Sequence, residues 1–491
     1  MPDAIQLGEW TPDQPDRRNA ALEAKGVISI AGAYAPFKAF SSYGSDAKTT
    51  ATCLGAKGVY DSAGDGALFM GDATKLYKLV SRAATDVSLS GGYSVSTDAW
   101  WQFEQFGSYV VAVAASTAPQ VYQLGVSSAF ANLGGSPPQA TCVARVNDFL
   151  MMGKDFTVYW SAFNNITSWS PSAATQAGTQ ALDQAQGKIQ TIVGGEYAAI
   201  FQERAIRRAV YVGPPVIWDF GQDAVESARG CVSAFGAIKF GRVIFYVSDD
   251  GFYAFDGNAS TPIGAGKVDD YYVRNLNYGY RHRICAAVDT INKLVVFGIP
   301  TGSATQISEL LIYSIGDGRW THDDTSLELL LDLPVEALTV DNFHLYEPSD
   351  NLDSSNLDSI NIDSNVFDEK RRLLAGVAST SHTLGTYTGA NRQAIIDTGE
   401  FEVAPGRRAL VTELWPVGDF ASTAISCAVG KRSALPGDSV TYSNPTNMNR
   451  AGYCPQRVDA RFLRARLQIA AASAWRRAEG VHATVRPTGG R

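Results

Sequence analysis

The chain has 491 residues, of which 45% are hydrophobic and only 18% are charged, and its formal net charge is −8. This length exceeds the size at which a single hydrophobic core usually stops growing, so the sequence predicts several domains or one closed repeat architecture. The acidic balance argues against a protein dedicated to binding nucleic acid, because such a protein presents a basic surface to the phosphates.

Residues 1–40 are expected to form an extended arm. They contain no basic segment followed by an apolar stretch and a small-residue cleavage site, so no secretory signal is predicted and synthesis in a cytoplasm is expected. The longest apolar runs of the chain, such as Val110–Ala115, have the length of strands. No membrane-spanning segment is therefore predicted.

Residues 41–400 contain repeated pairs of short apolar segments joined by polar or glycine-containing turns. Such pairs are typical of β-hairpins, and Asp250-Gly251 is the strongest turn signal among them. Together with 46 glycines, 21 tyrosines and 22 phenylalanines, they predict an all-β protein. The predicted hairpins are Ala67–Met70 with Lys75–Val80, Tyr109–Ala114 with Gln120–Leu124, Asp148–Met152 with Phe156–Trp160, Tyr197–Gln202 with Ala205–Tyr211, Arg242–Val247 with Phe252–Phe255, and Lys293–Gly298 with Glu309–Ser314.

These hairpins recur at nearly regular intervals. Their first strands begin at residues 67, 109, 148, 197, 242 and 293, so that successive steps measure between 39 and 51 residues. A spacing of this size is typical of a β-propeller, in which each blade is one four-stranded sheet. We therefore predict a propeller of roughly six or seven blades over residues 41–400. A succession of β-sandwiches is the alternative.

Residues 317–370 interrupt the pattern and are predicted to be an acidic insertion in the propeller. They hold 14 acidic and 2 basic residues, and residues 351–365 read NLDSS, NLDSI and NIDSN in succession. This period fits neither a helix nor a strand, which favours a surface loop of Asn/Asp-Ser turns, either solvated or facing a partner through Asp353, Asp358 and Asp363. Carboxylates could also hold Ca²⁺, but the EF-type spacing is absent, so no metal is predicted.

Residues 401–491 are expected to form a separate, C-terminal β-sandwich-like domain. From residue 400 onward the chain holds 13 basic and 7 acidic residues. Arg461, Arg464 and Arg466 lie in one predicted strand, and a guanidinium group can bind carboxylates through two donors. We predict that they contact another subunit or an acidic neighbour, with solvation or pairing inside the domain as the alternative. The predicted strands are Leu410–Val417, Ala424–Val429 and Arg461–Ile469.

No catalytic or cofactor-binding motif is found, and we expect no enzymatic activity. The six cysteines lack CxxC spacing and are expected to be buried, reduced thiols, and the five histidines are too dispersed for a local metal motif. Gly264-Ala-Gly266-Lys267 looks like part of a phosphate-binding loop, but Thr261 and Val268 occupy two of its required positions, so a turn is predicted. The strongest enzymatic alternative is a sialidase-like glycosidase, since Ser314–Trp320 and Ser161–Trp169 loosely resemble the box that holds propeller turns together.

A set of phrases spread over nearly the whole chain points to one family. As a set, they resemble the large tail proteins of short-tailed bacteriophages and their prophages. The phrases are Thr11-Pro-Asp-Gln-Pro15, Leu22-Glu-Ala-Lys-Gly-Val-Ile28, Gly32-Ala-Tyr34, Val158-Tyr-Trp-Ser161, Trp169-Ser-Pro171, Gly194-Gly-Glu-Tyr197, Ile200-Phe-Gln-Glu203, Asp249-Asp-Gly-Phe-Tyr-Ala-Phe-Asp-Gly257, the Asp-Ser pentads, and the closing Gly452-Tyr453, Arg461-Phe-Leu-Arg464, Trp475 and Gly480.

The resemblance implies a structural protein of the virion tail, assembled in the host cytoplasm. It implies a ring, most simply a homo-hexamer, that forms a hub or nozzle below the head-to-tail adaptor and contacts tail fibres or spikes. Genomic DNA would pass through its lumen without sequence-specific binding, and an acidic lumen would not retain phosphates. No catalytic residues and no cofactors are implied.

An alternative non-enzymatic function is binding of a receptor or glycan, in which exposed aromatic rings stack on sugar faces. Trp100-Trp101 is the natural candidate for such a contact. Adjacent residues of a strand point to opposite faces, so at least one of the two rings is expected in the core.

Overall fold

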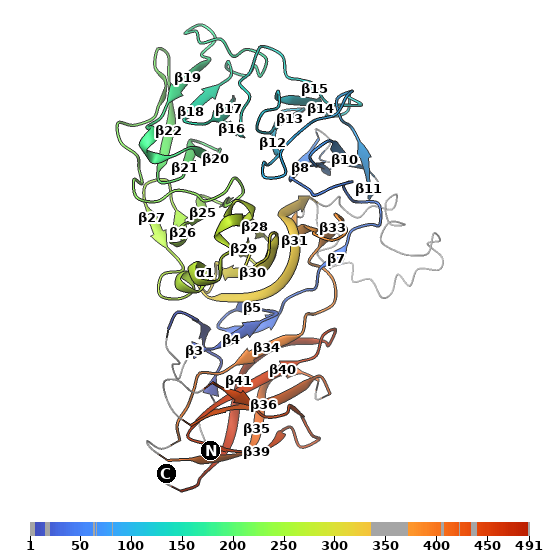
Figure 1. The fold of residues 1–491 in the computed structure, drawn as a ribbon, viewed down its shortest axis with the longest axis vertical. Helices are drawn as coiled ribbons and strands as arrows, with labels where there is room; N and C mark the ends of the chain where they lie inside the picture. Colours follow the sequence, from blue (N-terminus) through green and yellow to red (C-terminus); the bar gives the residue numbers. More distant parts are fainter. Residues whose placement is uncertain are drawn as a thin grey trace.

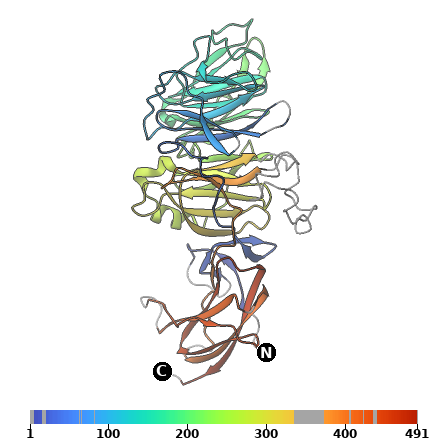
Figure 2. The same cartoon turned by 90° about the vertical axis from the view of Figure 1, so that its right-hand side faces the viewer.

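The computed structural model describes residues 5–14, 20–61, 64, 66–80, 82–334, 372–403, 407–421, 423–433 and 439–489. In this part of the chain almost every regular element is a strand (Figure 1). A ring of small sheets forms one end of the molecule, and a second β domain, which carries both chain termini, forms the other (Figures 1 and 2). No helix of the described residues has the length and apolar character needed to cross a membrane.

Five separate four-stranded sheets follow one another along the chain as the first five blades of the ring. Within each blade, consecutive strands are antiparallel neighbours. The five blades are β8–β11 (Gly55–Tyr60, Gly66–Gly71, Leu76–Val80, Ala83–Asp86), β12–β15 (Gln102–Phe106, Tyr109–Val113, Gln120–Gln123, Ala131–Asn132), β16–β19 (Cys142–Val146, Phe149–Lys154, Thr157–Trp160, Gly178–Ala181), β20–β23 (Ile189–Val193, Ala198–Gln202, Ile206–Gly213, Ile217–Asp219) and β24–β27 (Ala237–Phe240, Val243–Ser248, Gly251–Phe255, Ser260–Pro262).

The central strands of a blade are buried on both faces, because each blade packs between two neighbours. In β13, Val110 and Ala112 belong to the hydrophobic cluster shared with the first blade, whereas Val111 and Val113 belong to the cluster shared with the third. Strand geometry sends alternate side chains to opposite faces, so a strand covered on both sides needs a continuous apolar run. The uninterrupted apolar segment Val110–Val113 therefore fits a strand that is buried on both faces, and it does not fit a strand with one face exposed to solvent.

Two further blades share the long strand β31 (Trp320–Pro334). The first half of β31 pairs with β30 and completes the sixth blade, and its second half, after a register shift, pairs with β32. The first strands of neighbouring blades contact each other around the ring, and β31 finally contacts β8, so the described chain forms seven blades. The added strands are β28 (Cys285–Asp289), β29 (Leu294–Ile299), β30 (Ile307–Ser314), β32 (Arg372–Ala378), β33 (Leu384–Thr386) and β7 (Ser41–Ser42).

The ring closes through pairing between distant parts of the chain. The outer strand of the seventh blade is β7, from the N-terminal part, and it pairs antiparallel with β33. The hydrogen bond from the amide of Tyr43 to the carbonyl oxygen of Leu384 (2.9 Å) continues this contact. Closure of the ring packs the first and last blades against each other and so covers the apolar faces that an open array of blades would leave exposed.

The predicted all-β propeller class is confirmed, and each of the six predicted hairpins forms the second and third strands of a blade. The pairings β9 with β10, β13 with β14, β17 with β18, β21 with β22, β25 with β26 and β29 with β30 are all antiparallel. Helical segments are few in the described residues: α1 (Asp269–Asn275), η1 (Gln184–Gln186) and η2 (Tyr278–Arg283). Gly264–Lys267, predicted as a turn, is one, since the Lys267 amide donates to the Gly264 carbonyl at 2.9 Å.

The second domain is built from two sheets that share one hydrophobic core. One sheet has the order β39-β35-β41-β6-β5, with β1 beside β41, and the other runs β4-β34-β40-β36-β37, with β38 beside β36. The short strands β2 and β3 form a separate parallel pair. The bounds are β1 (Ile5–Gln6), β2 (Glu9–Trp10), β3 (Ala20–Ala21), β4 (Glu23–Lys25), β5 (Val27–Ile30), β6 (Ala33–Pro36), β34 (Ala394–Asp397), β35 (Ala409–Phe420), β36 (Ile425–Arg432), β37 (Thr441–Tyr442), β38 (Thr446–Asn447), β39 (Cys454–Ala460), β40 (Phe462–Ile469) and β41 (Trp475–Pro487).

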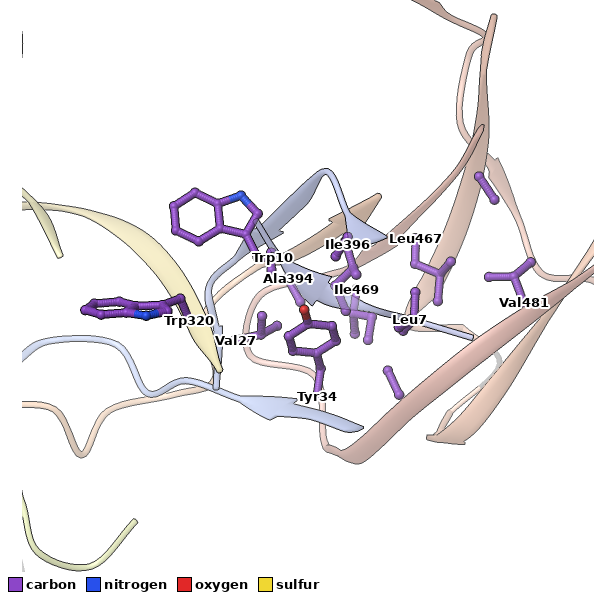
Figure 3. Packing of buried hydrophobic residues seen from close by; sticks show 14 of the residues in the cluster. Leu7, Trp10, Val27, Tyr34, Trp320, Ala394, Ile396, Leu467, Ile469 and Val481 are labelled. Carbon is purple, nitrogen blue, oxygen red and sulfur yellow. The ribbon is translucent and has the colours of Figure 1, made fainter. Parts of the chain in front are cut away.

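The core of this domain continues into the propeller. Figure 3 shows Tyr34 of β6 and Leu467 of β40 in the same cluster as Trp320 of β31, and all three side chains are buried. Lys25 in β4 also forms a parallel bridge with His322 in β31, which joins a sheet of the second domain to the sixth blade. The two domains are therefore packed and hydrogen-bonded together.

The structure changes two of the predicted regions. Residues 5–14 and 20–36, expected within an extended arm, contribute strands β1 to β6, because their short apolar stretches are covered by β41, β34 and β31. The beginning of the predicted acidic insertion is strand β31, whose leucines face the core of the seventh blade. The pentad aspartates Asp353, Asp358 and Asp363 lie outside the described residues.

Candidate functional site

The predicted interface arginines bind carboxylates of their own domain. Arg464, in β40, is 9% exposed, and its Nη2 donates to Glu400 Oε1 at 2.8 Å. Arg466 donates from Nε and Nη2 to the two oxygens of Asp397, at 2.6 and 2.7 Å. Arg461 is more exposed and pairs with Glu402 at 2.8 Å.

These pairs are the alternative of pairing inside the domain, and contact of the arginines with another subunit or an acidic neighbour stays a prediction. Glu400 also accepts a hydrogen bond from Arg432, so one buried carboxylate holds two guanidinium groups. The Arg466 guanidinium lies 3.7 Å from the centroid of the Tyr442 ring. A charged group this deep in a domain must be paired where it lies, and the basic strand β40 is matched by the acidic segment that follows β34.

A second buried ionic cluster joins the two domains. His322 of β31 contacts Glu23 of β4 through Nε2 and lies 3.1 Å from Glu309 Oε1 of β30 through Nδ1. The Tyr271 hydroxyl donates to the same Glu309 oxygen at 2.8 Å, and the Trp10 ring stacks on the imidazole with a centroid distance of 4.5 Å. One histidine thus connects strands of the propeller with strands of the second domain.

The charge of His322 follows from these contacts. Burial alone would lower the pKa of His322, but the hydrogen bonds and charges of Glu23 and Glu309 outweigh it and raise the pKa to about 9. The imidazole is therefore protonated at neutral pH and forms charge-assisted hydrogen bonds with both carboxylates.

Further polar contacts fix the same junction. Asp317, in the turn before β31, accepts hydrogen bonds from the Ser29 hydroxyl at 2.8 Å and from the Ala31 and Gly32 amides at 3.2 and 3.1 Å. Burial tends to raise the pKa of Asp317, but these donors lower it overall. Ser314–Trp320, one of the two segments that loosely resembled a glycosidase box, therefore anchors the turn between β5 and β6 through Asp317.

A pocket of about 360 Å³ lies on the face of the propeller where successive blades are connected. Its lining includes residues of the segments that lead into the first strands of five blades: Asp98 and Trp100, Thr141, Lys188, Ser233, and His282. The first strands surround the axis of a propeller, so this pocket is a natural place for a ligand.

One ion pair and one histidine–carboxylate contact line this pocket. Lys188 Nζ lies 3.0 Å from Asp155 Oδ1, and His282 Nε2 lies 3.7 Å from Asp98 Oδ1. Burial, helped by the nearby charge of Arg283, lowers the pKa of His282. The Trp100 indole donates to the His282 carbonyl at 2.8 Å, which fixes both residues, and Trp101 is fully buried.

Four cysteine thiols of the propeller are buried. Burial raises the pKa of the Cys53, Cys142, Cys231 and Cys285 thiols to about 12, which makes them inert at neutral pH. In this part of the chain no group of three or more His, Cys, Asp or Glu side chains has the geometry of a metal site.

Seven four-stranded blades around one axis, joined to a two-sheet β domain, place the chain among the β-propeller proteins. No protein-family model and no curated protein matches the sequence. Similar solved structures include a computationally designed protein, with a TM-score of 0.37 and 10% identity over 78% of this chain and 99% of that chain. The extracellular domain of a one-component system from B. thetaiotaomicron has a TM-score of 0.37 and 11% identity over 87% of this chain and 48% of that chain. BamB from Moraxella catarrhalis has a TM-score of 0.32 and 12% identity over 61% of this chain and 93% of that chain.

The residues of this pocket, which we call the axial pocket, were not predicted from the sequence, because they come from connections far apart in the chain. Asp98, Lys188, Ser233 and His282 all precede the first strand of a blade. Their position in the repeat could have identified them. The residues just before the first strand of each blade lie near the axis once the blades close into a ring.

Proposed function

We propose that this chain is a structural protein of the tail of a short-tailed bacteriophage, forming the hub or nozzle ring below the head-to-tail adaptor. The proposal rests on the short sequence segments that resemble those of the tail proteins of short-tailed phages. These segments lie in both domains of the fold. Val158–Ser161 overlaps strand β18, Asp249–Gly257 covers the turn after β25 and all of β26, and Gly32–Tyr34 begins in the turn that Asp317 anchors.

The observation that carries this proposal is the interlocking of the two domains. Strands β1 to β6 belong to the second domain while β7, directly after them, closes the propeller. His322 and its two carboxylate partners fix the junction from inside. An elongated subunit with a fixed angle between its domains suits a ring whose copies must stack in register along a tail.

The overall charge is compatible with this role. A net charge of −8 disfavours retention of DNA in a lumen, because like charges repel at the distances of a narrow channel. In this proposal the function lies in assembly with copies of the chain, with the adaptor and with fibres or spikes, and DNA passes without being recognised.

The test combines native mass spectrometry and negative-stain imaging of the purified chain, alone and with the adaptor, with immunogold labelling of phage particles. We expect six-fold rings that bind the adaptor and label at the tail. A chain that stays monomeric with the adaptor and is absent from particles would contradict the proposal. Glycan binding by the isolated chain would favour the receptor alternative, and glycan turnover the glycosidase.

A further inference from the structure

Two cysteines of the second domain, Cys427 and Cys454, meet in its core from opposite sheets. Cys427 lies in β36, where it alternates with the core residues Ile425 and Val429. Cys454 is the first residue of β39 and pairs with the core residue Leu414 of β35. The strands β36 and β39 belong to different sheets, and both cysteines are 0% exposed. Both thiols therefore lie in the space between the two sheets.

Hydrogen bonds between the sheets hold the beginning of β39 against Cys427. Gln456, two residues after Cys454, donates from Nε2 to the Cys427 carbonyl oxygen at 2.8 Å. The same amide donates to Thr446 Oγ1 at 2.7 Å, and Thr446 is the partner of Cys427 in β38. The Thr446 hydroxyl donates to the carbonyl oxygen of Pro455, the residue after Cys454, at 2.8 Å. These bonds fix the two cysteines opposite each other.

The two thiols are also hydrogen-bonded to each other. This bond raises the pKa of Cys427, and burial raises it further. The same bond lowers the pKa of Cys454, as does a hydrogen bond with the Cys427 backbone, and together they outweigh the opposite effect of burial. The thiolate is the reactive form of cysteine, so Cys454 is the better nucleophile of the two. Thiols in contact need little backbone movement to form a disulfide.

We propose that Cys427 and Cys454 are a redox-active pair that forms a disulfide between the two sheets, with a small disulfide such as oxidised glutathione as the oxidant. The Cys454 thiol loses its proton, and its thiolate attacks one sulfur of the oxidant and releases the first small thiol. The Cys427 thiol then loses its proton, attacks the Cys454 sulfur of this mixed disulfide and releases the second small thiol. The protein loses two electrons and two protons, and the oxidant takes up both.

The disulfide would join an edge of one sheet to the other sheet. In the described part of the chain β39 is the edge strand of its sheet, with β35 as its neighbour. The end of an edge strand opens locally at low cost, which gives the oxidant access to Cys454. Once formed, the bond holds β39 against β36 and restricts the unfolded chain, so the second domain becomes more stable under oxidising conditions. This property goes beyond the proposed ring assembly and does not depend on it.

The test equilibrates the full-length protein with mixtures of oxidised and reduced glutathione and counts free thiols by mass spectrometry after alkylation in denaturant. We expect the wild type to lose two of its six thiols under oxidising conditions. Lys431 and Arg450 lie between the two cysteines, so trypsin separates them and a linked pair of peptides identifies the bond. We expect the oxidised protein to melt several degrees above the reduced protein.

Single variants show which thiols react. Cys427→Ala should carry glutathione on Cys454, whereas Cys454→Ala should lose no thiol; glutathione on Cys427 of the second variant would overturn the assigned order of attack. Cys142→Ala removes a buried thiol of the propeller and should still lose two thiols. A wild type that keeps all its thiols in oxidised glutathione, or a bond between other cysteines, would overturn the proposal. If the single variants do not fold, the linked peptides of the wild type decide.

Discussion

The buried His322 at the domain junction makes the stability of this protein sensitive to pH on the alkaline side. Its pKa is raised from the usual 6.5 to about 9 in the folded chain, so the folded state binds this proton more tightly than the unfolded state. The corresponding stabilisation is about 3 kcal/mol. It is fully present below about pH 6.5, declines as the pH rises and is lost above about pH 9.

The assay is urea unfolding of the wild type and of His322→Gln at pH values between 6 and 10. Asp269, whose pKa burial raises to about 7, and the four thiols whose pKa burial raises to about 12 also weaken the folded state as the pH rises, but they do so equally in the wild type and in the variant. We therefore expect the wild type to lose about 3 kcal/mol more than the variant across the range. The variant should start lower, because Glu23 and Glu309 lose their partner. His482→Gln, in β41, is the control and should behave as the wild type. Parallel curves for wild type and His322→Gln would refute the reasoning.

Two other perturbations follow from the packing. Arg464→Ala leaves the buried Glu400 short of a partner and should destabilise the second domain by about 3 to 5 kcal/mol. Arg461→Ala should cost at most about 1 kcal/mol, because that pair is more exposed. Chemical denaturation measures both losses, and equal losses would contradict the burial argument. In Gly385→Ala the added Cβ would lie 2.4 Å from the Phe40 ring and push β7 off the seventh blade. Limited proteolysis should therefore cut the N-terminal segment faster than in the control Gly316→Ala, whose Cβ meets no neighbour. Equal cleavage rates would exclude this role for β7.

The propeller was predictable because its repeated hairpins are local. Asp250-Gly251 and its flanking apolar segments form the hairpin β25–β26. Its antiparallel register is continuous from the pair Ser248–Gly251 to the pair Ile244–Phe255. Apolar runs such as Val110–Val113 also needed no distant information, since a strand covered on both faces is apolar throughout. Six of the blades therefore had a visible signal in the sequence.

The seventh blade and the charged sites depend on contacts that no local pattern encodes. That blade takes its strands from three separate segments, ending with β7 of only two residues, Ser41–Ser42. The basic strand containing Arg464 was predicted correctly as a strand, but its pairing with Glu400 was not predicted, because Glu400 lies 64 positions earlier. For the same reason the burial of Arg283 could not be predicted, since Thr97 and Trp100 meet it from another blade.

The pairing of β7 with β33 has a consequence for the order of events during synthesis. The strand β7 leaves the ribosome early, but its partner Leu384–Thr386 follows only after all the other blades have been made. At 5 to 20 residues per second, that delay is on the order of half a minute. During this time β1, β4 and β7 have no native partners, because β41, β34 and β33 come later in the chain, and the apolar face of the N-terminal strands is open to aggregation or to binding by chaperones. Ring closure is then a late step, so a chain cut short before residue 384 should leave the ribosome with six blades and an unprotected edge.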